Sequence, residues 1–194
     1  MRTSIAGLTV LAATALAAVA PAAHAADCGA AADRPVLSGS TTKSGVYVRS
    51  ASEKRAVGIT ICLINAERRA AGVEPLRRHA LLSALAGKHA GDLVRNGVTG
   101  GDLHKGSDGS TPTTRLRPYT ANFGRSSFRV GETVVPLRAD NSPARAVRAW
   151  MESDVHRAIL LDPELEDVGL GVYAKQPGGA RGGTYVATFG TVRN

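Results

Sequence analysis

Cysteine and aromatic residues are scarce in this 194-residue chain. Its only cysteines are Cys28 and Cys62, so no C-x-x-C motif exists and a cysteine zinc site is excluded. Aromatic residues make up 4% of the chain and are not interleaved with its basic pairs. The basic residues form no run longer than a pair, although the formal charge is +8. A nucleic-acid-binding module usually concentrates its charge, so we expect no specific nucleic-acid partner. A solvated basic surface is the expected consequence, and weak, nonspecific attraction to anionic wall polymers or membrane lipids is the alternative.

Several catalytic signatures are also missing. The chain has no G-x-S-x-G, no H-E-x-x-H and no Walker loop, and no activated serine or cysteine nucleophile stands out. After the first 25 residues no segment is apolar enough to span a bilayer. The few histidines and acidic residues of the chain are therefore the remaining candidates for a functional site.

The first 25 residues read as a secretory signal peptide. Arg2 supplies the positive charge, residues 5 to 20 are almost all apolar, and Ala23-His24-Ala25 fits a cleavage site. A membrane anchor is the alternative, but the apolar run is short for a span. Cleavage leaves a secreted chain of about 169 residues, which suits one domain. In an oxidising compartment Cys28 and Cys62 are expected to form a disulfide; two buried free thiols are the alternative.

Apolar periodicity organises the first half of the mature chain. Residues 26–52 form an irregular N-terminal segment, and residues 53–194 form the domain. Helices are predicted over 53–71, ended by Gly72, and over 79–96, ended by Gly97. Residues 98–127 are loop-like, with a short helical turn over 113–116. A short strand is expected within 127–137, around Glu132.

The second half begins with a well-marked helix. Ser142-Pro143 provides an N-cap and a proline at the first helical position. The helix turns Val147, Trp150 and Met151 inward and is expected to break near Ser153, because Asp154 would otherwise fall in the apolar stripe. Two alternating strands follow, over 167–173 and 184–190, joined by the hairpin loop Q-P-G-G-A-R-G-G. The pattern predicts an α+β fold in which helices pack on an antiparallel sheet.

Four residues are candidates for a site: His104, Glu132, Glu152 and His156. Two histidines with one or two carboxylates have the chemistry to bind a divalent metal such as zinc, or to act as an acid–base pair. The alternative is that the histidines are only solvated. Glu152 then pairs with Arg148 and Asp154 with Arg157.

The order of motifs resembles the CAP superfamily of cysteine-rich secretory, antigen 5 and pathogenesis-related-like proteins, in its bacterial secreted (SCP-like) branch. The segments that carry the resemblance are L-I-N-A-E-R-R-A-A-G-V-E-P-L (63–76), A-L-A-G-K-H-A-G-D-L (84–93), L-H-K-G-S-D-G-S-T-P-T-T-R-L-R (103–117), V-G-E-T (130–133), A-W-M-E-S-D-V-H-R-A-I-L-L-D-P (149–163), V-G-L-G-V and T-F-G. They span about residues 57 to 190, nearly the whole mature domain.

The resemblance implies a three-layer α-β-α sandwich with a central antiparallel sheet. It also implies a cleft in which His104, Glu132 and His156 meet and hold a divalent ion, most often zinc, with Glu152 as a possible fourth ligand. His89 matches a family position too, but its place on a packed helix face indicates a structural role. Some surrounding positions depart from the family pattern: Thr133, Val155, Asp102-Leu103 and Ala187.

The function expected from this resemblance is that of a secreted binding module. Its cleft would hold a small ligand, a lipid or peptide, or a metal, and the protein is expected to be a monomer. The alternative is a metal-assisted extracellular hydrolase acting on a peptide or wall component, with Glu132 as general base. Binding is favoured over catalysis because no nucleophile is apparent.

Overall fold

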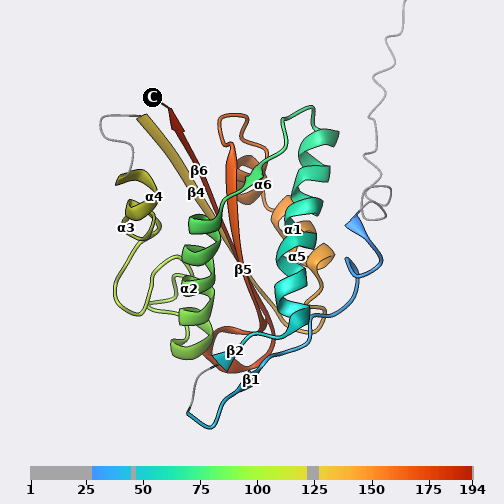
Figure 1. Ribbon diagram of the computed structural model, residues 1–194, viewed down its shortest axis with the longest axis vertical. Helices are drawn as coiled ribbons and strands as arrows, with labels where there is room; N and C mark the ends of the chain where they lie inside the picture. Colours follow the sequence, from blue (N-terminus) through green and yellow to red (C-terminus); the bar gives the residue numbers. More distant parts are fainter. Residues whose placement is uncertain (1–27, 45–46, 122–126, 194) are drawn as a thin grey trace, which may run out of the picture.

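The computed structural model describes residues 28–44, 47–121 and 127–193, so the predicted signal peptide lies outside the described residues (Figure 1). The elements run in the order β1 (Ser40–Thr41), β2 (Tyr47–Val48), α1 (Ala51–Ala70), β3 (Arg77–Arg78), α2 (Ala80–Asn96), α3 (Pro112–Arg115), α4 (Arg117–Thr120), β4 (Ser127–Leu137), α5 (Pro143–Met151), α6 (Asp154–Leu160), β5 (Asp167–Lys175), η3 (Pro177–Gly179) and β6 (Arg181–Arg193). None of the helices in the described ranges is both long and apolar enough to cross a membrane.

The main sheet has the strand order β3-β5-β6-β4. The long strand β6 pairs antiparallel with β5 on one side and with β4 on the other. This confirms the predicted antiparallel sheet for the three long strands. The two-residue strand β3, which was not predicted, pairs parallel to β5. Because β4 is the last strand in this order, its outer edge is the place where loops and helices from both faces can meet.

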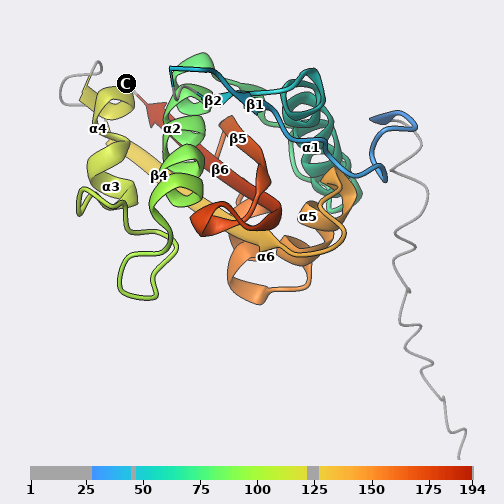
Figure 2. The same ribbon diagram turned by 90° about the horizontal axis from the view of Figure 1, so that it is seen from below.

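Helices cover both faces of the sheet (Figure 2). On one face, α2 packs Ala86, Ala90 and Leu93 against Val134 and Val186. On the other, helices α1, α5 and α6 share a larger apolar core with β5 and β6. That core includes Val57, Ile61, Ile64, Val147, Trp150, Leu160, Val168, Leu170, Val172, Tyr185, Ala187 and Phe189. The three-layer α-β-α sandwich is therefore confirmed.

Strand β5 is buried on both faces, whereas the predicted alternation described only the face with Val168 and Leu170. Two glycines explain the second buried face. A Cβ built on Gly169 would lie 2.0 Å from the carbonyl carbon of Leu82, and one on Gly171 would lie 2.4 Å from the carbonyl oxygen of Ala86. The glycines thus let the α2 backbone approach the strand.

The predicted helix signals around residue 142 are confirmed. The Ser142 hydroxyl accepts a hydrogen bond from the backbone N–H of Arg145, and Pro143 is the first residue of α5. Helix α5 ends at Met151 and α6 begins at Asp154, so the chain breaks its helix at Ser153 as the sequence predicts.

The N-terminal segment is irregular apart from the small β1–β2 pair, and it is attached firmly to the domain. The predicted disulfide joins Cys28 to Cys62 of α1. The buried carboxylate of Glu53 accepts hydrogen bonds from the backbone N–H groups of Gly39 and Ala174, at 3.1 and 2.8 Å. A single acidic side chain thus ties the segment to both α1 and β5.

Candidate functional site

Glu132 lies on the edge strand β4, and the strand register decides which way it points. Glu132 is opposite Thr188 and Val134 is opposite Val186 on β6. Directly paired residues share a face of a sheet, and Val186 packs against α2. The Glu132 side chain therefore lies on the α2 face, where it is 1% exposed.

The charge of this buried carboxylate is balanced by Arg115, a residue that the sequence did not single out. Arg115 is the last residue of α3, a short helix that begins with the N-cap Thr111 and Pro112. Its Nη2 donates to both oxygens of Glu132, at 2.8 and 3.0 Å, and to the carbonyl oxygen of His104 at 2.8 Å. The Arg115 side chain is 10% exposed and that of Glu132 is 1% exposed, so the ion pair is largely desolvated.

His104 completes this contact from the loop that follows α2. Its backbone N–H donates to Asp102 Oδ1 at 2.8 Å, and its Nδ1 lies 3.0 Å from Glu132 Oε1. Because an ionised carboxylate only accepts hydrogen bonds, Nδ1 is the donor and Nε2 is left for an external partner. Nε2 forms no hydrogen bond within the described part of the chain. The hydrogen bond to Glu132 raises the pKa of the half-exposed His104 imidazole.

His89 belongs to the same polar cluster, although the sequence indicated only a structural role. Its ring is buried on α2, with Nε2 2.9 Å from the carbonyl oxygen of Leu103 and 3.9 Å from Glu132 Oε1. Burial lowers the pKa of this imidazole. The carbonyl acceptor requires the proton on Nε2, and the buried Nδ1 has no hydrogen-bond partner among the described residues.

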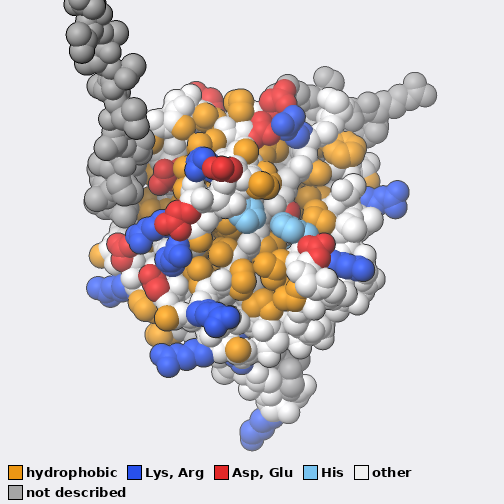
Figure 3. Space-filling view, turned by 180° about the vertical axis from the view of Figure 1, so that it is seen from behind, with side chains coloured by type: hydrophobic (Ala, Val, Ile, Leu, Met, Phe, Trp, Pro, Cys, Tyr) orange, Lys and Arg blue, Asp and Glu red, His pale blue; other side chains and the backbone are white. Residues whose placement is uncertain are grey.

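His156 approaches from the opposite face of the sheet, on α6. This helix packs tightly on β4, because a Cβ on Gly131 would lie 3.0 Å from Ile159 Cγ2. His156 is half-buried. Burial is the main cause that lowers the pKa of its imidazole, and the positive charge of His104 is a smaller cause in the same direction. This electrostatic influence indicates that the two imidazoles lie near each other. Figure 3 shows two histidine side chains next to each other on the face opposite that of Figure 1, with hydrophobic side chains around them.

Two arginines fix the ends of α6 and so the position of His156. Arg157 Nη1 donates to the carbonyl oxygen of Met151 at 2.8 Å across the helix break, and Nη2 pairs with Asp154 as predicted. At the other end, the buried Arg68 donates to the carbonyl oxygens of Leu160 and Leu165. These contacts satisfy carbonyl groups that a helix terminus leaves unpaired.

Glu152, the possible fourth ligand, is not oriented by this cluster. It is the exposed C-cap residue of α5 and pairs with Arg145 at 3.3 Å. The expected partner, Arg148, was therefore wrong. The expectation that Glu152 forms a surface ion pair is confirmed.

Among the three predicted metal ligands, the carboxylate of Glu132 is already engaged by protein groups. No group of three histidine, cysteine, aspartate or glutamate side chains that could hold an ion occurs in the described ranges. Both oxygens of Glu132 already accept hydrogen bonds, and Arg115 supplies the positive charge beside them. Zinc usually needs at least three protein ligands. The metal site thus stays a prediction.

Fold and site together define a class: α-β-α sandwiches that carry a histidine–glutamate cluster at the edge of the sheet. The model of the cysteine-rich secretory protein (CAP) family matches residues 61–189. The chain belongs to this family, as the order of its motifs predicted.

Bacterial proteins are among the relatives. The uncharacterized protein YkwD of Bacillus subtilis is 30% identical over 131 residues, which are 68% of this chain and 46% of that protein. The chain thus spans about half the length of this curated relative.

Two solved structures share the fold. An extracellular protein containing an SCP domain from Bacillus anthracis is 22% identical, with a TM-score of 0.60 over 84% of this chain and 48% of its own. An outer surface protein of Borrelia burgdorferi is 21% identical, with a TM-score of 0.58 over 75% of this chain and 97% of its own.

Proposed function

We propose that this protein is a secreted binding module whose cleft holds a small ligand through His104 and His156 and needs no metal ion. The observation that carries the proposal is the guanidinium of Arg115 on both oxygens of Glu132, in the position where a bound cation would be expected. Relatives that are described as extracellular or outer-surface proteins, together with the predicted leader, support secretion.

The chemistry of the two imidazoles indicates the group that binds. His104 has a raised pKa and presents Nε2, so it offers a hydrogen bond with partial positive charge to an acidic or carbonyl oxygen. His156 has a lowered pKa and offers a neutral imidazole beside it. Next to His156, Val155 is 71% exposed, and hydrophobic side chains lie beside the two histidines that Figure 3 shows. A lipid or peptide ligand with a carboxylate matches this combination.

A direct test uses octanoate as the probe and octanol as its uncharged counterpart. Both are titrated into protein that has been stripped of metal with a chelator, and the imidazole resonances of His104 and His156 are followed by NMR. Octanoate is expected to shift both histidines in a saturable manner, and octanol to shift them much less.

The matched variants are His104→Ala, which removes the donor, and His79→Ala, which removes a half-buried histidine at the start of α2. Binding should be lost only in the first. Octanoate binding that appears only after zinc is added would instead favour the metal-dependent alternatives, including the hydrolase.

A further inference from the structure

A cavity lies on the α2 face of the protein. One wall is α2, with Lys88, Asp92 and Arg95, and the other wall is the segment 108–118, which includes α3. Its volume is about 320 Å³. That is at the lower end of the range of about 300–1,000 Å³ for small-molecule sites, and suits a compact ligand better than a polymer.

One of the residues that line this cavity, His89, has a buried hydrogen-bond acceptor without a donor. His89 and Arg115 both line the cavity. Since His89 Nε2 donates to the carbonyl oxygen of Leu103, its Nδ1 carries a lone pair, and that atom has no partner among the described residues. His89 is 1% exposed, and a buried polar atom without a partner is costly. A hydroxyl or amide group in the cavity, or a water in its absence, would satisfy Nδ1.

Apart from Arg115, whose charge Glu132 balances, the walls carry two cationic and two anionic side chains. Lys88 and Arg95 form no ion pair and no side-chain hydrogen bond in the described part of the chain, so their donors are available. Two carboxylates oppose them. Asp92 accepts hydrogen bonds from Ser107, and Asp108 accepts one from the backbone of Ser110.

This balance selects among ligand classes. An ion of either sign would be attracted by half of these groups and repelled by the other half. Hydroxyl groups both donate and accept, so a ligand rich in them can meet the cations, the carboxylates and His89 Nδ1 at once. Leu85 and Pro118, also in the lining, provide apolar surface for the C–H groups of a ring.

We infer that the cavity between α2 and the segment 108–118 is a second ligand site, for a neutral polyhydroxylated compound of one or two rings, such as a saccharide unit. The lining does not include His104 or His156, so the site is distinct from the cleft, although Arg115 contacts both. The inference rests on the cavity and on the unpartnered nitrogen of His89, and it does not depend on the proposed function of the cleft.

The probes are two neutral disaccharides, cellobiose and N,N′-diacetylchitobiose, with gluconate and glucosamine as charged polyols. Each is titrated into the full secreted chain, and the His89 imidazole and the α2 amide resonances are followed by NMR. At least one neutral disaccharide should shift them in a saturable manner, and neither charged polyol should bind more tightly than it.

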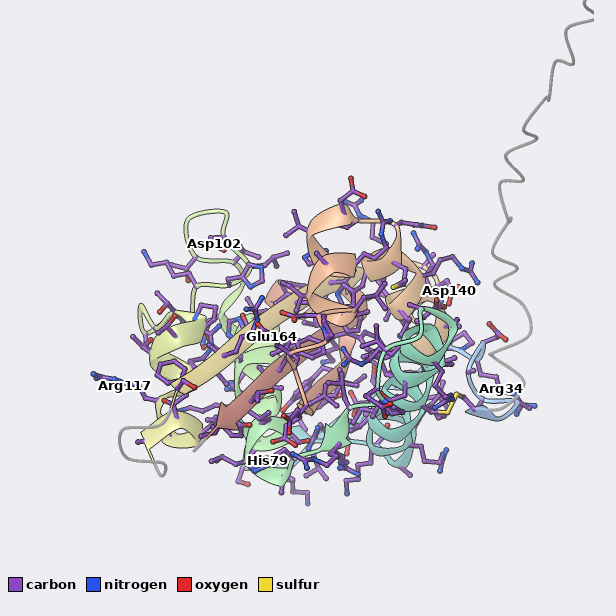
Figure 4. The ribbon with its side chains drawn as sticks, turned by 90° about the horizontal axis from the view of Figure 1, so that it is seen from above. Arg34, His79, Asp102, Arg117, Asp140 and Glu164 are labelled. Carbon is purple, nitrogen blue, oxygen red and sulfur yellow. A yellow bond between two sulfur atoms is a disulfide. The ribbon has the colours of Figure 1, made fainter. Side chains whose placement is uncertain are left out.

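Variants then test the location. Arg95→Gln and Lys88→Gln change exposed side chains of α2 and are each expected to weaken binding about tenfold, the effect of losing one hydrogen bond from a charged donor. Arg117→Gln is the control, because Arg117 is exposed and points away from the body of the protein (Figure 4). His104→Ala should leave disaccharide affinity unchanged.

Three results overturn the inference. One is that neither disaccharide moves the His89 resonances. Another is that a charged polyol binds better than both neutral sugars. The third is that sugar binding survives in Arg95→Gln and Lys88→Gln but is lost in His104→Ala, which would place it in the cleft.

Discussion

Replacing Arg115 by methionine would leave the Glu132 carboxylate buried without its charged partner. The side chain of Glu132 is 1% exposed, and the variant removes both hydrogen bonds from Nη2 to this carboxylate as well as the one to the carbonyl oxygen of His104. Breaking a buried ion pair by removing one partner typically costs about 3–5 kcal/mol. Since Arg115 retains some solvent contact and His104 still donates to Glu132, we expect about 3 kcal/mol at neutral pH.

Urea unfolding of the wild type, Arg115→Met and the double variant Arg115→Met/Glu132→Gln measures this loss. The double variant removes the buried charge, so it should recover a large part of the stability lost by Arg115→Met alone. Zinc should also stabilise Arg115→Met more than it stabilises the wild type, because an oxygen of Glu132 becomes free beside His104. A loss below about 1 kcal/mol, the size of an exposed pair, would refute the reasoning, and so would equal stability of the single and double variants.

The remaining predictions concern pH, the N-terminal segment and the disulfide. The pKa of His104 is raised in the folded state, so its contribution to stability is complete below the unfolded value of about 6.5 and is lost as pH rises through the folded pKa. His104→Ala should therefore cost more stability in urea unfolding at pH 6 than at pH 9. The opposite order would contradict the hydrogen bond from Nδ1 to Glu132. Glu53→Gln should lower the free energy of unfolding by about 2–3 kcal/mol, because the buried carboxylate accepts hydrogen bonds from Tyr47, Ser50, Gly39 and Ala174. Glu67→Gln, on the same helix, should change this free energy little. Equal effects of the two variants in calorimetric melts would count against the stabilising role of the Glu53 hydrogen bonds. The secreted protein should weigh about two daltons less than its reduced form. Cys28→Ser should lower the free energy of unfolding by about 3–4 kcal/mol, because the disulfide joins residues 34 apart in the sequence. Thiol labelling without reductant would show that the disulfide is absent.

Local chemistry explains which parts of the fold could be predicted. The caps at Ser142 and Gly97 and the break at Ser153 depend on residues within one helical turn, and the structure confirms each of them. The two-residue strand β3 has no comparable local signal. It exists because its backbone pairs with β5, which is distant in the sequence.

The residues of the candidate site likewise fall into those that could be predicted from the sequence and those that could not. The resemblance led to His104, Glu132 and His156, and the first two are hydrogen-bonded. Arg115 could not be predicted as a site residue, because it ends a four-residue helix that is too short to show a helical hydrophobic period. The direction of Glu132 depends on the pairing of β4 with β6, which no local pattern reveals, and this pairing also brings His89 into the cluster.

The central claim, that the cleft binds its ligand through His104 without a metal, is tested most directly by the octanoate titration of chelator-treated protein. We predict saturable shifts of the His104 and His156 imidazole resonances that are unchanged by added zinc, and no shift of the His156 resonance in His104→Ala. Binding that requires zinc, or that persists in His104→Ala, would contradict the claim.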